Sequence, residues 1–414
     1  MNPGNRRELP QRLLIATAVL FFFLGALFLK PHPGAAGEPA SPKFIFIFVA
    51  DGAGTTHLEI TRLYSQHAHR EGLIITDRIL GGGFLGLMTT HSADSLITDS
   101  AAAATALASG CKTKNGAVGI CADGRPAKTV FEIGKERGMR LGLVTNAEIY
   151  DATPAAFASH AKSRNLFSSI IDQYLKLEPD LLMGGGREYF VPRSQPGSRR
   201  KDPKDMLSLF RKRGFNYMTN REELMAARGP KLLGLFSLGP MSFENDRNPK
   251  IEPSLHDMTH TALRVLQENL ARGFIILVEN ENIDNAGHGS NLAALVRDFK
   301  ELDKAVGLAY EFYRQHPRET LILVTSDHET GGLTLAGKRR KLIPGLRPDS
   351  LSELIGPERA RNIQISWSTS GHTAQPVFVG ALGIGAERFR GYQDNTDFAR
   401  HLFGLLRVEI RTAR

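Results

Sequence analysis

The sequence predicts a doubly wound α/β fold, in which helices cover both faces of a mostly parallel β-sheet. Four short runs, residues 44–49, 141–144, 274–278 and 321–324, are continuously apolar, which is typical of strands that are buried on both faces. Apolar residues recur every three or four positions over residues 292–310, a pattern that predicts an amphipathic helix. Strands that alternate with helices in this way indicate an α/β sheet.

Two helices can be bounded more closely. One is expected over residues 255–270. The other begins near Leu292 and should end near His316, because Pro317 follows.

The composition is globular, with 42% hydrophobic and 23% charged residues in a chain of 414. The net charge of +9 is a mild basic bias that favours anionic substrates or membrane surfaces. There is no basic stripe interleaved with aromatic residues and no zinc-finger spacing, so we expect no nucleic-acid-binding module. Residues 41–414 should form a single domain, with polar insertions at about 187–248 and 336–364 on the periphery of the sheet.

The first 40 residues are typical of a leader and linker. Arg6, Arg7 and Arg12 precede an uncharged apolar run over residues 13–29. This pattern indicates either a secretory signal peptide or a single membrane anchor. Both interpretations place the rest of the chain in the periplasm or another extracytoplasmic location, with the arginines on the inner side. Whether the leader is cleaved stays open.

The only two cysteines, Cys111 and Cys121, are separated by nine residues. In an oxidising compartment they can form a local disulfide, and the alternative is two free thiols. Without paired histidines nearby they make a poor zinc site.

Polar side chains follow several of the predicted strands. Each has an ordinary alternative: Asp51 can belong to a common Asp-Gly turn, Asp327 and His328 to a satisfied polar pair, and His372 to a loop. Their joint placement at strand ends is harder to explain without metal ions, because carboxylates beside imidazoles are costly in a core unless they are paired or coordinated. Mixed oxygen and nitrogen ligands suit zinc and oxygen ligands suit magnesium, so two or more ions are expected. The residues concerned are Asp51, Glu279, Asp284, His288, Asp327, His328 and His372.

Ser100 opens an alanine-rich run that should be helical. A helix N-terminus favours phosphate, and a serine beside a metal can act as a nucleophile, although such serines are more often N-caps. Arg164 follows Asp151 by 13 positions. Its guanidinium can hold two phosphate oxygens, although an isolated arginine is more often a surface residue.

Taken together, these motifs resemble those of the alkaline phosphatases, from about residue 43 to the C-terminus. The resemblance implies a three-layer α/β/α sandwich with a large, mostly parallel central sheet. It rests on Asp51-Gly-Ala-Gly54, Thr98-Asp-Ser-Ala-Ala102, Asp151-Ala-Thr153-Pro, Glu279 with Asp284 and His288, Thr325-Ser-Asp-His328, and Ser370-Gly-His-Thr373.

The resemblance also implies a role for each residue. Ser100 corresponds to the nucleophile and Arg164 to the phosphate clamp. One zinc would be held by Asp284, His288 and His372. A second zinc would be held by Asp51, Asp327 and His328. A magnesium ion would be held by Asp51, Thr153 and Glu279, with Asp151 holding a water molecule of that ion. The family is commonly dimeric, so a homodimer is expected.

The implied activity is hydrolysis of phosphate monoesters through a phosphoserine, with release of inorganic phosphate. The alternatives are a related phosphodiesterase or sulfatase, in which threonine or a modified cysteine usually replaces the serine, or a non-catalytic metal- or phosphate-binding protein. Asn285 lies where some relatives carry lysine, histidine or tryptophan, so we expect it to influence phosphate binding and the pH optimum. Glu281 receives no role and is expected to be a solvated loop residue.

Overall fold

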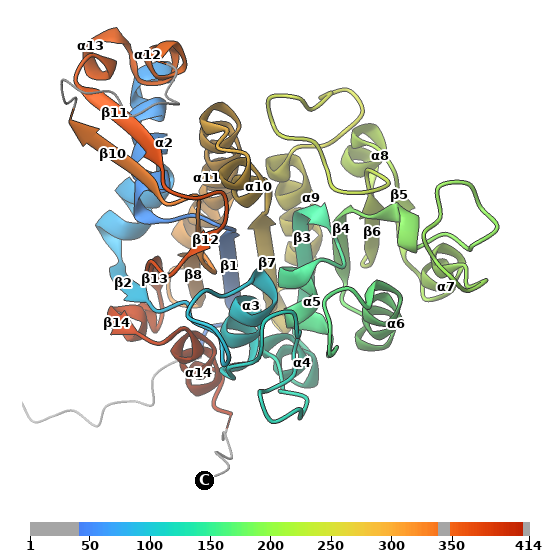
Figure 1. The fold of residues 1–414 in the computed structure, drawn as a ribbon. Coiled ribbons are helices and arrows are strands. Elements are labelled where there is room, and N and C mark those ends of the chain that lie inside the picture. Colours follow the sequence, from blue (N-terminus) through green and yellow to red (C-terminus); the bar gives the residue numbers. More distant parts are fainter. Residues whose placement is uncertain (1–40, 338–347, 409–414) are drawn as a thin grey trace, which may run out of the picture. The chain divides into compact units, whose positions relative to one another are not determined.

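A ten-stranded sheet runs through the part of the chain that the computed structural model describes, residues 41–337 and 348–408 (Figure 1). In spatial order its strands are β14 (Gly391–Gln393), β2 (Phe84–Met88), β13 (Val377–Gly383), β8 (Thr320–Thr325), β1 (Phe44–Ala50), β7 (Phe274–Asn280), β3 (Arg140–Glu148), β4 (Leu181–Gly185), β6 (Leu232–Leu235) and β5 (Asn216–Met218).

The sheet is mostly parallel, as predicted. Only β13 runs antiparallel to its two neighbours, β2 and β8. β1 lies in the middle, with parallel β7 on one side and parallel β8 on the other. All four apolar runs became central strands of this sheet, which confirms the α/β fold class.

Helices cover the sheet on both sides, and β1 shows why. Its alternate side chains Phe44, Phe46 and Phe48 enter one hydrophobic core, together with residues of α2 (Thr55–Ala68), α9 (Leu255–Gln267) and α11 (Leu292–Gln315). The intervening side chains Ile45, Ile47 and Val49 enter a second core. That core is completed by α3 (Ser100–Ser109), α4 (Val130–Glu136), α5 (Ala152–Ala158), α6 (Phe167–Leu177), α7 (Met206–Lys212) and α14 (Asn395–Leu405). The strands are therefore apolar on both faces because each face packs on a layer of helices.

Both predicted helices are present. α11 ends at Gln315, just before the predicted stop. α9 begins at Leu255 as predicted but ends at Gln267, before the predicted end at Leu270, where a separate 3-10 turn, η3 (Leu270–Arg272), begins.

The two polar segments lie in different settings. Residues 187–248 contribute β6 and β5, which extend one edge of the central sheet, with η2 (Arg187–Tyr189), α7 and α8 (Arg221–Ala226) beside them. The described part of residues 336–364 belongs to a separate two-stranded sheet, β10 (Leu333–Gly337) with β11 (Ile363–Trp367), and to α12 (Pro348–Ile355) and α13 (Pro357–Ala360). The remaining elements are η1 (Ile75–Leu80), β9 (Glu329–Thr330), α10 (Asn282–His288), β12 (His372–Thr373) and η4 (Ala386–Phe389).

Cys111 and Cys121 are joined by a disulfide in the connection between α3 and α4. The leader predicted over residues 1–40 lies outside the described residues, so it stays a prediction.

Candidate active site

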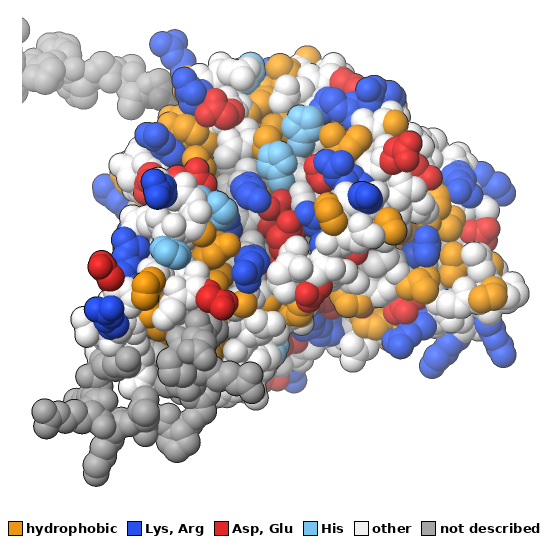
Figure 2. All heavy atoms as spheres, turned by 90° about the horizontal axis from the view of Figure 1, so that it is seen from above, with side chains coloured by type: hydrophobic (Ala, Val, Ile, Leu, Met, Phe, Trp, Pro, Cys, Tyr) orange, Lys and Arg blue, Asp and Glu red, His pale blue; other side chains and the backbone are white. Residues whose placement is uncertain are grey.

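The ends of three adjacent strands bring the predicted site residues to one edge of the sheet. Val49 of β1 is level with Glu279 of β7 and with Thr325 of β8. Asp51 and Asp327 each follow two residues beyond that level, so three carboxylates lie at or just beyond the ends of neighbouring strands. Looking down on the top of Figure 1, histidine side chains lie beside acidic ones on this face (Figure 2). The candidate site lies at the carboxyl ends of the parallel strands, where ligands bind in open α/β sheets.

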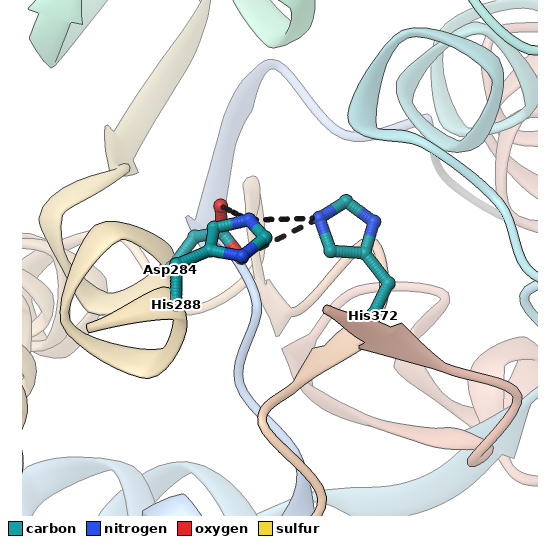
Figure 3. Close-up of side chains that lie close together, drawn as sticks. All are labelled: Asp284, His288 and His372. Carbon is teal, nitrogen blue, oxygen red and sulfur yellow. Dashed lines mark hydrogen bonds and ion pairs between the residues drawn. The ribbon is translucent and has the colours of Figure 1, made fainter. Parts of the chain in front are cut away.

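Asp284, His288 and His372 form the first cluster (Figure 3). Asp284 and His288 lie one turn apart on α10, and His372 reaches them from β12. The Nε2 atom of His288 lies 3.1 Å from Asp284 Oδ2 and 3.2 Å from the Nε2 atom of His372. Three ligand atoms from two elements therefore converge on one point.

Backbone carbonyls set the direction of both imidazoles. His288 Nδ1 lies 2.6 Å from the Ser370 carbonyl oxygen, and His372 Nδ1 lies 2.8 Å from that of Thr98. A carbonyl accepts only from a protonated nitrogen, so these contacts leave Nε2 of each ring free to bind a metal, as in many metal-ligating histidines. Without a metal, the hydrogen bond with Asp284 raises the pKa of His288 to about 9.

Asp51, Asp327 and His328 form the second cluster, and all three are buried. His328 Nε2 lies 3.2 Å from Asp327 Oδ2 and 3.5 Å from Asp51 Oδ1. Among the described residues, neither of these two carboxylate oxygens accepts a hydrogen bond. Burial, followed by the charge of Asp327, raises the pKa of Asp51 well above its usual value. Buried oxygens without donors fit a cation, which would compensate their charge.

Asp51, Glu279 and Glu281 form the third cluster, and their ligand atoms lie within 4.8 Å of one another. The prediction for Glu281 was wrong: it is not a solvated loop residue, because its Oε2 atom is buried and, within the described ranges, has no hydrogen-bond partner. Thr153, predicted for the same ion, is fully buried at the start of α5 with its hydroxyl oxygen also unpartnered there. Burial raises the pKa of Glu279 to about 8.

Ser100 lies at the first position of α3 and touches the second cluster. Its Oγ atom is 3.1 Å from His328 Nε2. The N-cap of α3 is Asp99, whose side chain accepts a hydrogen bond from Ala102 N. The N-cap alternative for Ser100 is therefore wrong, because the Asp99 carboxylate caps the helix and the Ser100 hydroxyl faces the cluster instead.

Arg164 and Asp151 face the site together. The Nη2 atom of Arg164 lies 3.0 and 2.9 Å from the two carboxylate oxygens of Asp151, and its Nη1 atom lies 3.6 Å from Asp99. Burial opposes its charge, but Asp151, Glu281 and Asp99 together outweigh burial and raise the pKa of Arg164, so the guanidinium stays positive. Asn285 is exposed on α10 and donates weakly to Asn282, one turn back.

The donor sets of all three clusters fit metal ions. The first two combine histidine nitrogens with carboxylates, and the third offers oxygens alone. A serine hydroxyl, a guanidinium and a helix N-terminus lie beside them, an arrangement that can hold a phosphoryl group and attack it.

Fold and site thus indicate a hydrolase of the α/β class whose side-chain clusters fit metal ions, and comparison with known proteins gives its family. The family model described as alkaline phosphatase matches residues 42–350. An alkaline phosphatase of Schizosaccharomyces pombe is 32% identical over 90% of this chain and 83% of its own length.

Solved structures of alkaline phosphatases are also similar to this chain. The alkaline phosphatase of Thermus thermophilus superposes with a TM-score of 0.78 at 28% identity, over 90% of this chain and 93% of that one. A variant alkaline phosphatase of the Antarctic bacterium TAB5, with magnesium bound in its M3 site, gives a TM-score of 0.74 at 28% identity, over 90% of this chain and all of that one. The chain belongs to the alkaline phosphatase family and is an enzyme of that class, the phosphoric monoester hydrolases.

Proposed function

We propose that this enzyme hydrolyses phosphate monoesters through a phosphoserine on Ser100, at a centre built for two zinc ions and one magnesium ion. The observation that carries the proposal is the position of the Ser100 hydroxyl, 3.1 Å from His328 Nε2 and at the first turn of α3.

The first and second clusters would each hold a zinc ion, since zinc accepts histidine nitrogen and carboxylate oxygen. The third cluster, with Thr153, would hold magnesium, which prefers oxygen. When bound, these ions supply positive charge that stabilises the serine alkoxide, the leaving oxygen and the phosphoryl oxygens. A variant of the similar TAB5 alkaline phosphatase binds magnesium, which supports a magnesium ion as one of the three.

The protein's own groups orient the substrate. Arg164 would bind two non-bridging oxygens of the phosphate, and Asp151, which accepts from it, fixes the plane of the guanidinium. The free N–H groups at the start of α3 face the same negative charge. Ser100 Oγ then attacks phosphorus in line with the departing alcohol, and water hydrolyses the phosphoserine to release inorganic phosphate. Asn285 would border the phosphate without adding charge.

The test is Ser100→Ala, which should abolish nearly all turnover of a chromogenic phosphate monoester while the protein still binds its metals. The matched control is Ser109→Ala at the other end of α3, where the hydroxyl donates to Thr105 O and faces no cluster. Mass spectrometry of an acid-quenched reaction should detect phosphate on Ser100 in the wild-type enzyme. Full activity of Ser100→Ala would refute the nucleophile.

Relative rates on monoester, diester and sulfate substrates separate this proposal from the phosphodiesterase and sulfatase alternatives. A metal-loaded wild-type protein with no turnover on any of them would favour the binding-protein alternative.

We also propose an extracytoplasmic location and a homodimer. A disulfide between Cys111 and Cys121 suits an oxidising compartment. None of the helices within residues 41–337 and 348–408 has the length and apolar character to cross a membrane. Mass measurement of the secreted protein and its sedimentation behaviour would test the leader and the dimer.

A further inference from the structure

Glu281 is a carboxylate of the third cluster, and none of the roles proposed for the site residues includes it. It follows β7 directly and precedes the first residue of α10. Its Oε2 atom is buried and, in the described part of the chain, unpartnered, and a carboxylate oxygen of Glu281 lies within 4.8 Å of ligand atoms of Asp51 and Glu279. A flexible solvated glutamate would turn away from two other carboxylates, so something must hold it there.

Hydrogen bonds with Asn146 of β3 and with Ser242 hold residues 280–282 in place. The amide nitrogen of Glu281 donates to Asn146 Oδ1 of β3 at 2.8 Å. The Nδ2 atom of Asn146 donates to Asn280 Oδ1 at 2.9 Å. Asn282 Nδ2 donates to the Ser242 carbonyl oxygen at 3.0 Å. Three consecutive residues are therefore tied down, and the Glu281 side chain leaves this segment toward the cluster.

Among the described residues, the negative charge gathered at the third cluster exceeds the positive charge that protein groups bring to it. Asp51, Glu279 and Glu281 bring three carboxylates together, and Asp151 is close enough to repel Glu281. Arg164 contributes attraction to Glu281, but its Nη2 atom is already engaged by both oxygens of Asp151. Buried carboxylates in this number must either take up protons or be compensated by a cation. Glu279 Oε1 supplies an independent sign of one, because it is fully buried and has no hydrogen-bond partner among the described residues.

We propose that Glu281 is a direct ligand of the third cation, beside Asp51, Glu279 and the hydroxyl of Thr153. This rests on the proposed function and adds a third carboxylate to that site. An oxygen-only set of three carboxylates selects a hard divalent ion of the magnesium type over zinc, which prefers sites with nitrogen or sulfur. The Glu281 carboxylate would also replace water molecules that magnesium otherwise keeps, so the ion should be held tightly.

The test is Glu281→Gln, which keeps the size and hydrogen-bonding capacity of the side chain and removes its charge. Protein loaded with zinc is dialysed against a series of free magnesium concentrations, and bound zinc and magnesium are measured by elemental analysis. Removing groups that merely support a metal ligand weakens binding by about 10- to 100-fold, so loss of a ligand should raise the magnesium midpoint at least about tenfold. The zinc content should stay at two ions per chain.

Two further variants make the result specific. Glu311→Gln is the control, since Glu311 is an exposed residue of α11 that pairs only with Arg314 in the contacts seen for it, and its magnesium midpoint should equal that of the wild type. Glu281→Asp keeps a shorter carboxylate and should bind magnesium better than Glu281→Gln.

A magnesium midpoint of Glu281→Gln equal to that of the wild type would overturn the proposal, because the charge of Glu281 would then not be needed to bind the ion. The same holds if Glu281→Asp binds no better than Glu281→Gln. Failure of the proposed function looks different: the wild-type protein would then bind magnesium in a manner dependent on Glu281 yet hydrolyse no phosphate monoester.

Discussion

Thr145 controls how readily Glu279 can act as a metal ligand, and its replacement tests the third cluster from one step further out. At 2.6 Å from Glu279 Oε2, the Thr145 hydroxyl donates a hydrogen bond to that carboxylate, and it accepts one from Ala147 N at 2.9 Å. Burial raises the pKa of Glu279 to about 8, and the bond from Thr145 opposes that rise. The carboxylate must lose its proton to bind a metal. Thr145→Val should therefore weaken magnesium binding.

The size of the effect follows from the single bond that is lost. A hydrogen bond to a charged group contributes about 1.5–3 kcal/mol, which corresponds to a loss of magnesium affinity of about 10- to 150-fold. The assay is equilibrium dialysis of zinc-loaded protein against magnesium, followed by elemental analysis. Activity at limiting magnesium should fall in parallel and recover when magnesium is added in excess.

Two controls separate this effect from a loss of stability. Thr145→Ser keeps the hydroxyl and should bind magnesium like the wild type. Thr325→Val alters another buried threonine at a strand end, but there the hydroxyl donates to the Phe378 carbonyl oxygen at 2.8 Å and to no ligand. It should lower stability without moving the magnesium midpoint. If Thr145→Val binds magnesium as tightly as Thr145→Ser, the reasoning about Glu279 is refuted.

Two other changes test the first cluster and the pH dependence of stability. Gly52→Ala would place a Cβ atom 2.5 Å from Asp284 Oδ1 at a φ of +73°, so elemental analysis should show the loss of one zinc ion. Gly116→Ala has a φ of +85° and open space around the new Cβ atom, so this control should keep both zinc ions. Equal zinc contents in the two variants would contradict the prediction. The hydrogen bond that His160 Nε2 donates to Glu132 Oε1 raises the pKa of His160. The pair therefore stabilises the fold below the unfolded value of about 6.5 and loses that contribution as pH rises through the raised value. His160→Gln should then lower the free energy of unfolding in urea by about 1 kcal/mol or less, mainly at pH values below the raised pKa. A decrease that did not change with pH would argue against this reasoning.

The strand ends of the site could be predicted from the sequence because they need only local information. A continuous apolar run followed by Asp51, or by Asp327, predicts a buried strand and a polar residue at its carboxyl end. Parallel strands place those ends at one edge of the sheet, so the ligands are expected to meet. The same reasoning predicted α3 with Ser100 at its beginning.

The inward direction of Glu281 could not be predicted in this way. It depends on the hydrogen bond from its backbone to Asn146, a residue 135 positions earlier in the chain. The sequence also could not predict that Asp99 and not Ser100 is the N-cap of α3, because both residue types cap helices well. Only the folded structure shows which of the two side chains faces the cluster. β5 and β6 were missed because three and four residues within a polar segment carry too little pattern.

The segment from Thr98 to Ser100 links three parts of the chemistry through three consecutive residues. The Thr98 carbonyl oxygen accepts from His372 and so orients a ligand of the first cluster. Asp99 caps α3 and lies 3.6 Å from Arg164, the proposed phosphate clamp. Ser100 carries the proposed nucleophile. A shift of this segment would move the ligand, the clamp and the nucleophile together, so substitutions in it should combine non-additively, as expected for residues that act as a unit.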